Sequence, residues 1–197
     1  EEEKKYENYS KSIRRRAAII GGHNMDDYPL KMHVFNRARL IKNSKNRIPY
    51  GVDLIQKYKR ESWIVFTENK KQAKEFNKII NTKGFKSALY NTDLDSAERL
   101  ENLNKFKKSD LNVLVTCTAL DEGFDMPEAD GALILSASSS KRQRVQRMGR
   151  VLRITENKPN ALIVTVYSSK TEFDKLMEEA KRYHKEGVPV SWKRQDR

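Results

Sequence analysis

The chain has 197 residues, enough for one domain with an appendage. It carries 40 Lys and Arg against 27 Asp and Glu, and the net charge of +13 favours a polyanionic partner, with nucleic acid first and an acidic membrane surface second. No apolar run approaches the roughly 20 residues that a membrane-spanning helix needs, so a protein anchored in that way is excluded.

The first 60 residues have a helical pattern. A first helix is expected over 6–20, ended by two glycines, then a second that Asp26 or Asp27 caps and that runs to Ile41, and a third that begins at Pro49. Nine Lys and Arg and only one acid lie in the second half of this region. We predict a helical extension over 1–60 that braces neighbouring domains, and its basic middle favours a role along nucleic acid.

From Ser62 onward, short apolar runs alternate with amphipathic segments. Strands are expected at 63–67, 87–90, 111–116, 131–135 and 161–166, and helices at 69–81, 96–107, 141–151 and 171–184. Strands that are apolar throughout are typical of a parallel sheet that is buried on both faces. We therefore predict an α/β domain over 61–187 with helices on both faces of its sheet, followed by a basic tail over 188–197 that frays from Ser191 onward.

Ligands of such sheets bind beyond the carboxyl ends of the strands. The loops after Thr67, Tyr90, Thr116 and Leu135 are therefore where we expect the functional site. Tyr90 is the aromatic residue among them that we single out as a contact for a base or for the backbone of nucleic acid.

One of these loops, over 116–127, combines a glycine, a carboxylate and a proline. Gly123 permits a positive φ or a close backbone approach, and Pro127 rigidifies the exit of the loop. Asp125 is then held at the rim, where its carboxylate can accept hydrogen bonds from ribose hydroxyls or pair with an arginine. The alternative is an acidic loop without a functional role.

The segment 146–153 is the most informative part of the chain. Arg150 and Arg153 are three positions apart and share one face of a helix. The planar guanidinium suits phosphate oxygens, and such a pair can act as arginine fingers on the γ-phosphate of a nucleotide. The alternative is a basic surface helix that faces solvent or nucleic acid.

Together these segments resemble the second RecA-like domain of superfamily 2 helicases and translocases. Three motifs occur in the order of that family: 63–67 as motif IV, 116–127 as motif V and 146–153, in the form Gln-Arg-x-Gly-Arg-x-x-Arg, as motif VI. The phrases at 39–48, 120–129 and 136–140 are similar to the XPB-like branch of DNA repair helicases. Related phage and restriction-type helicases share similar phrases.

The resemblance implies a RecA-like fold and a role for each matching residue. In these proteins the arginines of motif VI act on ATP, motif V couples the nucleotide to nucleic acid, and neighbouring residues support contacts between domains. The corresponding residues are Arg150 and Arg153 as catalytic arginine fingers, Gln146 and Arg147 for nucleotide sensing and interdomain contacts, and Gly123 and Asp125 for coupling.

The resemblance also implies that Thr67, Cys117 and Thr118 lie near the nucleic-acid backbone. Many members of the family have Thr at the position of Cys117, and a thiol is a weak hydrogen-bond donor. Thr118 or backbone N–H groups are then expected to substitute at that contact. The alternative for Cys117 is a small buried residue without a chemical role.

The chain lacks the parts that cradle the phosphates. It contains no Gly-x-x-x-x-Gly-Lys-[Ser/Thr] segment, and no Asp-Glu-x-[His/Asp] box follows an apolar strand. ATP and Mg²⁺ would therefore be held mainly by an N-terminal RecA-like domain of the same protein, and we expect no useful ATP hydrolysis by the 197-residue chain alone. The three histidines have no metal-ligand spacing, so no metal site is predicted.

The start of the chain and its cysteine content bear on its origin. Residues 1–5 contain no initiator Met and no signal-peptide core, and we interpret them as the cut edge of a larger helicase. The single cysteine excludes an intrachain disulfide, which is typical of the prokaryotic cytoplasm or another reducing intracellular compartment.

Three functions stay open on the same fold. The first is the C-terminal motor domain of an ATP-dependent DNA helicase or translocase, which the XPB-like phrases favour. The second is an RNA helicase or a restriction-type motor, because the core of such domains binds the backbone and carries no base recognition. The third is a non-catalytic nucleic-acid-binding module, against which the two intact arginines argue.

Overall fold

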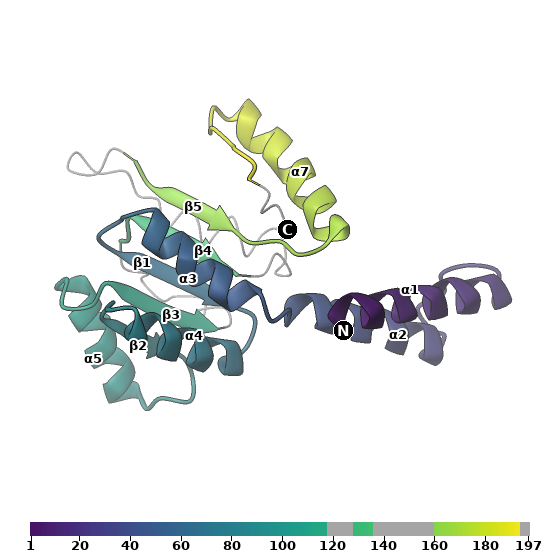
Figure 1. Ribbon diagram of the computed structural model, residues 1–197, viewed down its shortest axis with the longest axis horizontal. Coiled ribbons are helices and arrows are strands. Elements are labelled where there is room, and N and C mark those ends of the chain that lie inside the picture. The colour runs from purple at the N-terminus through teal and green to yellow at the C-terminus, as the bar shows by residue number, and fades with distance from the viewer. Residues whose placement is uncertain (118–127, 136–159, 194–197) are drawn as a thin grey trace.

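The computed structural model describes residues 1–117, 128–135 and 160–193. Its elements in chain order are α1 (Glu2–Ile19), α2 (Tyr28–Lys42), α3 (Arg47–Lys57), β1 (Trp63–Thr67), α4 (Lys70–Thr82), β2 (Ser87–Tyr90), α5 (Ser96–Lys107), β3 (Val113–Cys117), β4 (Gly131–Ile134), β5 (Leu162–Thr165) and α7 (Lys170–Lys185). Figure 1 shows a sheet domain from which the pair α1 and α2 projects to one side. The helix expected over 141–151 lies outside the described residues.

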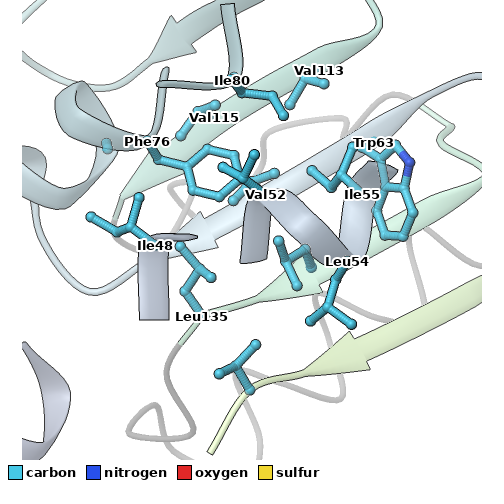
Figure 2. Close-up of a cluster of buried hydrophobic side chains, with 14 of the residues drawn as sticks. Ile48, Val52, Leu54, Ile55, Trp63, Phe76, Ile80, Val113, Val115 and Leu135 are labelled. Carbon is cyan, nitrogen blue, oxygen red and sulfur yellow. The ribbon is translucent and has the colours of Figure 1, made fainter. Parts of the chain in front are cut away.

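The five strands form one parallel sheet in the order β2-β3-β1-β4-β5, which confirms the predicted α/β fold. Alternate residues of β1 point to opposite faces of the sheet. Trp63 and Val65 pack with the helices α3 and α4 (Figure 2), whereas Ile64 and Phe66 pack with Leu103 and other residues on the side of α5. Every residue of β1 is buried, which agrees with the apolar run 63–66 that precedes Thr67.

Side-chain caps fix where several helices begin. The carboxylate of Asp95 accepts from the backbone N–H of Glu98 at the start of α5, and Asn69 and Ser169 cap α4 and α7 in the same way. Asp27, one of the two residues expected to cap the second helix, accepts from the backbone N–H of Leu30. These contacts are local in sequence, and the observed ends of these helices lie close to the predicted ones.

The helices α1 and α2 pack against each other as an antiparallel pair. Arg16 donates two hydrogen bonds to the carboxylate of Asp27, at 2.9 and 2.6 Å, and thereby ties the end of α1 to the start of α2. The Arg16 guanidinium, followed by the Leu30 N–H, lowers the pKa of Asp27. Near the other end of the pair, Arg37 lies over the ring of Tyr6.

The third helix belongs to the core of the sheet domain. It begins at Arg47 and not at Pro49, because proline is tolerated in the first turn, where its missing N–H would have no intrahelical acceptor. Val52 and Ile55 are each 1% exposed and pack on the face of the sheet covered by α4. The predicted domain boundary at residue 60 stays a prediction, and this packing favours a boundary before α3.

The expectation that the tail frays from Ser191 is wrong for the residues that the structure describes there. The ring of Trp192 lies against Phe173 and Tyr167, and Lys193 lies over the ring of Tyr58. Aromatic contacts, which a polar and basic composition did not indicate, hold this segment against the domain.

Gly131 is required by the close approach of β4 to Trp63. A Cβ at Gly131 would lie 2.6 Å from the rigid and fully buried indole ring. A Cβ at Gly51 would lie 2.5 Å from the flexible end of the Leu135 side chain and 3.2 Å from Leu133 and from the ring of Phe76. We expect Gly131→Ala to lower the free energy of unfolding by about 1–3 kcal/mol through overpacking. Gly51→Ala is the matched control and should cost less, because alanine in a helix gains about 0.5–1 kcal/mol over glycine. Urea denaturation measures both, and an equal loss would contradict this account of Gly131.

Candidate functional site

The strands β2, β3 and β1 end side by side at the carboxyl edge of the sheet. Tyr90 pairs in register with Thr116, and Thr67 pairs with Cys117. The structure therefore brings together three of the four residues predicted to contact nucleic acid. Thr118, the fourth, lies outside the described residues, as do Gly123, Asp125, Gln146, Arg147, Arg150 and Arg153, whose roles stay predictions.

Two of the three residues at this edge face the interior. Thr67 is 7% exposed, and its hydroxyl donates to the carbonyl oxygen of Thr116 at 3.1 Å, so it joins the ends of β1 and β3. Cys117 is 4% exposed and packs in the apolar core. Tyr90 is half-buried. The roles of these residues in binding nucleic acid stay predictions, and the burial of Cys117 favours the alternative of a small buried residue.

Two lysines at the start of α4 were missed by the sequence analysis. Lys70 and Lys74 lie one helical turn apart and both pair with Asp93, the second at 3.0 Å. The sequence carries a signal for Lys70, because a cation in the first turn of a helix opposes the helix dipole and is unusual there. The hydrogen bonds from Lys70 and then from Lys74 lower the pKa of Asp93, so its carboxylate stays charged at neutral pH.

A buried amide lies next to this ion-pair cluster. Asn91 directly follows β2 and is 4% exposed. Its Oδ1 accepts from the backbone N–H of Asp93 at 2.9 Å, whereas its Nδ2 is buried without a hydrogen-bond partner in the described part of the chain. A buried donor without an acceptor is costly, so its retention indicates a ligand-facing or otherwise strained position.

The base of the pair α1 and α2 contacts the same edge. Lys42 at the end of α2 pairs with Glu68 at 2.8 Å, and its carbonyl oxygen accepts from Gln72 at 2.9 Å. Asn69, the cap of α4, donates to Asn43 at 2.7 Å. These contacts connect the helical extension to the start of α4, where the two lysines lie.

Arg47 is a buried organising residue that the sequence analysis did not single out. It is 1% exposed, and all five of its N–H groups donate. The acceptors are the carbonyl oxygens of Ile41, Leu135 and Val166, at 3.0, 2.6 and 2.9 Å, the Ser168 hydroxyl at 2.7 Å and Glu172 at 2.5 Å. Arg47 therefore joins α3 to the ends of α2, β4 and β5 and to the start of α7.

The sequence of the sheet domain has a counterpart among known families. The helicase conserved C-terminal domain matches residues 46–155. The chain belongs to this helicase family. The match includes α3, in agreement with the packing of that helix on the sheet.

Two relatives of this helicase domain have names that refer to different nucleic acids. A DNA 3'-5' translocase, XPB2 of Sulfurisphaera tokodaii, is 35% identical over 129 residues, which are 66% of this chain and 28% of the translocase. An ATP-dependent rRNA helicase, RRP3 of Scheffersomyces stipitis, is 26% identical over 118 residues, which are 60% of this chain and 24% of that helicase. The chain thus spans about a quarter of these relatives' length.

The C-terminal domain of the DEAD-box protein Dbp5 has the same fold. Its structure superimposes with a TM-score of 0.63 at 21% identity and covers 74% of this chain and 82% of that chain. The predicted RecA-like fold is therefore confirmed. No described helix is long and apolar enough to cross a membrane, and residues 1–117, 128–135 and 160–193 contain no group of three or more metal-binding side chains.

We expect Arg47→Met to lower the free energy of unfolding by about 3–5 kcal/mol, because it leaves the Glu172 carboxylate buried without its partner. The measurement is urea denaturation, with Arg39→Met at an exposed position of α2 as the matched control. Adding Glu172→Gln to Arg47→Met should recover only part of the loss, because the carbonyl oxygens that Arg47 binds stay without a donor. A loss from Arg47→Met no larger than that of the control would contradict this role.

Proposed function

We propose that the chain is the second motor domain of an ATP-dependent DNA helicase or translocase, XPB-like and active in DNA repair or DNA processing. The observation that carries this proposal is the helicase-family match over 46–155, which includes the predicted motifs V and VI. The similarity to a protein named as a DNA 3'-5' translocase favours DNA as the substrate. Binding to phosphates makes the interaction independent of sequence.

The residues present fit one half of an ATP site. No acidic cluster that could hold Mg²⁺ occurs among the described residues, and the sequence has no phosphate-cradling loop. ATP with Mg²⁺ supplies the free energy of movement when it is held mainly by a first RecA-like domain. Arg150 and Arg153 would neutralise charge at the γ-phosphate, with Gln146 and Arg147 at the interface between the two domains.

The coupling segment and the carboxyl edge would form part of the nucleic-acid track. Gly123 and Asp125 would couple the nucleotide to nucleic acid. Lys70 and Lys74 lie at the edge where Thr67 and Tyr90 end their strands, and they would exchange Asp93 for phosphate oxygens. Such an exchange is favourable because phosphate contacts release counterions from nucleic acid.

The test of the motor proposal separates ATP turnover from binding. The purified 197-residue chain is expected to show no DNA-stimulated ATP hydrolysis. In a full-length protein with a first motor domain, Arg150→Ala and Arg153→Ala should each lower kcat by about 10³-fold or more, as loss of an arginine finger does. DNA binding should largely survive in both variants.

Arg142→Ala, a basic neighbour outside the Gln-Arg-x-Gly-Arg-x-x-Arg pattern, is the matched control and should keep its ATP turnover. ATP hydrolysis by the isolated chain, or equal turnover in the finger and control variants, would overturn the proposal. If the domain is a non-catalytic binding module, the finger variants should have the same ATP turnover and the same DNA binding as the unaltered full-length protein.

A further prediction concerns the ion-pair cluster at the carboxyl edge. In the 197-residue chain, Lys70→Ala and Lys74→Ala should each reduce the slope of log affinity for single-stranded DNA against log salt by about 1. Asp93→Asn should tighten binding, because it frees both lysines. Fluorescence anisotropy at several salt concentrations measures the slopes.

Lys181→Ala is the matched control, because this exposed lysine of α7 is also paired with an acid, Glu178, but lies away from the carboxyl edge. If the three lysine variants have the same slope, the carboxyl edge is not part of the track.

A second candidate function, an RNA helicase, has support from the similarity to an rRNA helicase. Tighter binding and stronger stimulation by RNA than by DNA of the same sequence would select it.

A further inference from the structure

An open groove with a volume of about 1110 Å³ lies between α3, β5 and α7. Its floor is β5, with Leu162 and Val164, and apolar atoms make up most of its surface. Apart from the tail itself, aromatic side chains from three separate segments line it: Tyr50, Tyr58, Tyr167, Phe173 and Tyr183. Aromatic walls on an apolar floor are typical of sites that accept extended peptide segments.

The C-terminal tail, residues 187–193, runs along this groove and forms part of its lining, so the volume is the space left with the tail in place. After α7 the chain turns at Gly187, which has a φ of +78°, and runs back beside the helix as the yellow segment in Figure 1. The ring of Trp192 has its centroid 5.1 Å from that of Phe173 and 6.3 Å from that of Tyr167, both in edge-on geometry. The Lys193 ammonium lies 5.2 Å from the ring centre of Tyr58.

The tail is held by few contacts. The backbone N–H of Val188 donates to Tyr183 at 2.9 Å, but no hydrogen bond involves 189–193 within the described part of the chain. Val188, Val190 and Trp192 remain 47%, 39% and 39% exposed. Exchange of residues 189–193 for another segment would therefore break ring contacts, but it would break no backbone hydrogen bond that the structure describes.

The tail also indicates what the groove selects. Pro189 has a fixed φ and no N–H, which favours an extended segment that does not need to pair with a strand. The sequence from 188 onward alternates small apolar residues and proline before the aromatic Trp192. An extended segment with a bulky aromatic residue after a proline thus suits the floor and the walls of the groove.

We propose that this groove is a peptide-binding site, that the tail is its internal ligand, and that its partner is an extended protein segment with an aromatic residue shortly after a proline. The partner segment displaces the tail and places its own ring against Phe173 and Tyr167, whose rings contact each other. The tail competes at the high effective concentration of a tethered ligand, so the site is partly blocked until the partner is abundant or binds at a second point.

The experiment uses Trp192→Ala in the 197-residue chain and a fluorescein-labelled peptide with the sequence of residues 187–193. Binding is measured by fluorescence anisotropy after circular dichroism has established that the variant is folded. The variant should bind the peptide about ten-fold more tightly than the unaltered chain or better, because the tethered ring no longer competes. The same peptide with alanine in place of its tryptophan should bind neither protein.

Tyr28→Ala removes an aromatic ring that is 71% exposed on α2, outside the groove, and should behave like the unaltered chain. Equal affinity of Trp192→Ala and the unaltered chain for the peptide, or equal binding of the peptides with and without tryptophan, would overturn the proposal. Either result would make the tail a fixed cap of the domain.

A second measurement needs no variant and decides the matter if Trp192→Ala does not fold. Trp63 is fully buried, so acrylamide quenching of tryptophan fluorescence reports mainly on Trp192. A peptide that carries phenylalanine in place of tryptophan should increase this quenching as it displaces the tail. Quenching that stays constant at high peptide concentration would contradict displacement.

Discussion

The buried guanidinium of Arg47 is the interaction on which the rest of the structure depends. It binds carbonyl oxygens at the ends of α2, β4 and β5 and the carboxylate of Glu172 on α7, and no water is needed to complete its hydrogen bonds. Without it, the buried Glu172 carboxylate would lose its cationic partner, and the carbonyl oxygens of Leu135 and Val166 would lose the guanidinium as their donor. Such losses are large in an interior of low dielectric constant. Arg47 thereby determines how α3 enters the core and how the strands end at the carboxyl edge.

That edge carries charge in a form that can be exchanged. Lys70 and Lys74 share the single carboxylate of Asp93, which offsets only one of their two charges, and the exposed position of these groups keeps each pair weak. Under the proposed function, a phosphate backbone would replace the single carboxylate at little cost, which would suit repeated binding and release of a strand. The contact between Lys42 and Glu68 places the base of the helical extension beside the same edge.

The groove over β5 makes contacts of a different kind from the ion pairs at the carboxyl edge. Its contacts are between rings and apolar side chains, so salt should affect the occupant of the groove much less than nucleic acid at the carboxyl edge. Arg47 lines the groove and binds the carbonyl oxygens that follow β4 and β5, whereas the lysine cluster with Asp93 follows β1 and β2. The two surfaces can therefore be probed separately, by salt for one and by aromatic substitution for the other.

The fold class, the order of the strands along the chain and the residues at the strand ends could be predicted from the sequence, because an apolar run such as 63–67 and the caps of the helices are local patterns. The burial of Cys117 and the packing of Trp192 could not be settled in this way, because either residue type is compatible with an exposed or a buried place. Arg47 illustrates the limit most clearly, since Leu135 and Glu172, its partners, are 88 and 125 positions away. Local spacing determined the elements and their likeness to a helicase domain. Only the tertiary structure decided which charges are buried, which are exchangeable and where the tail lies, because those outcomes depend on contacts between residues that are far apart in the chain.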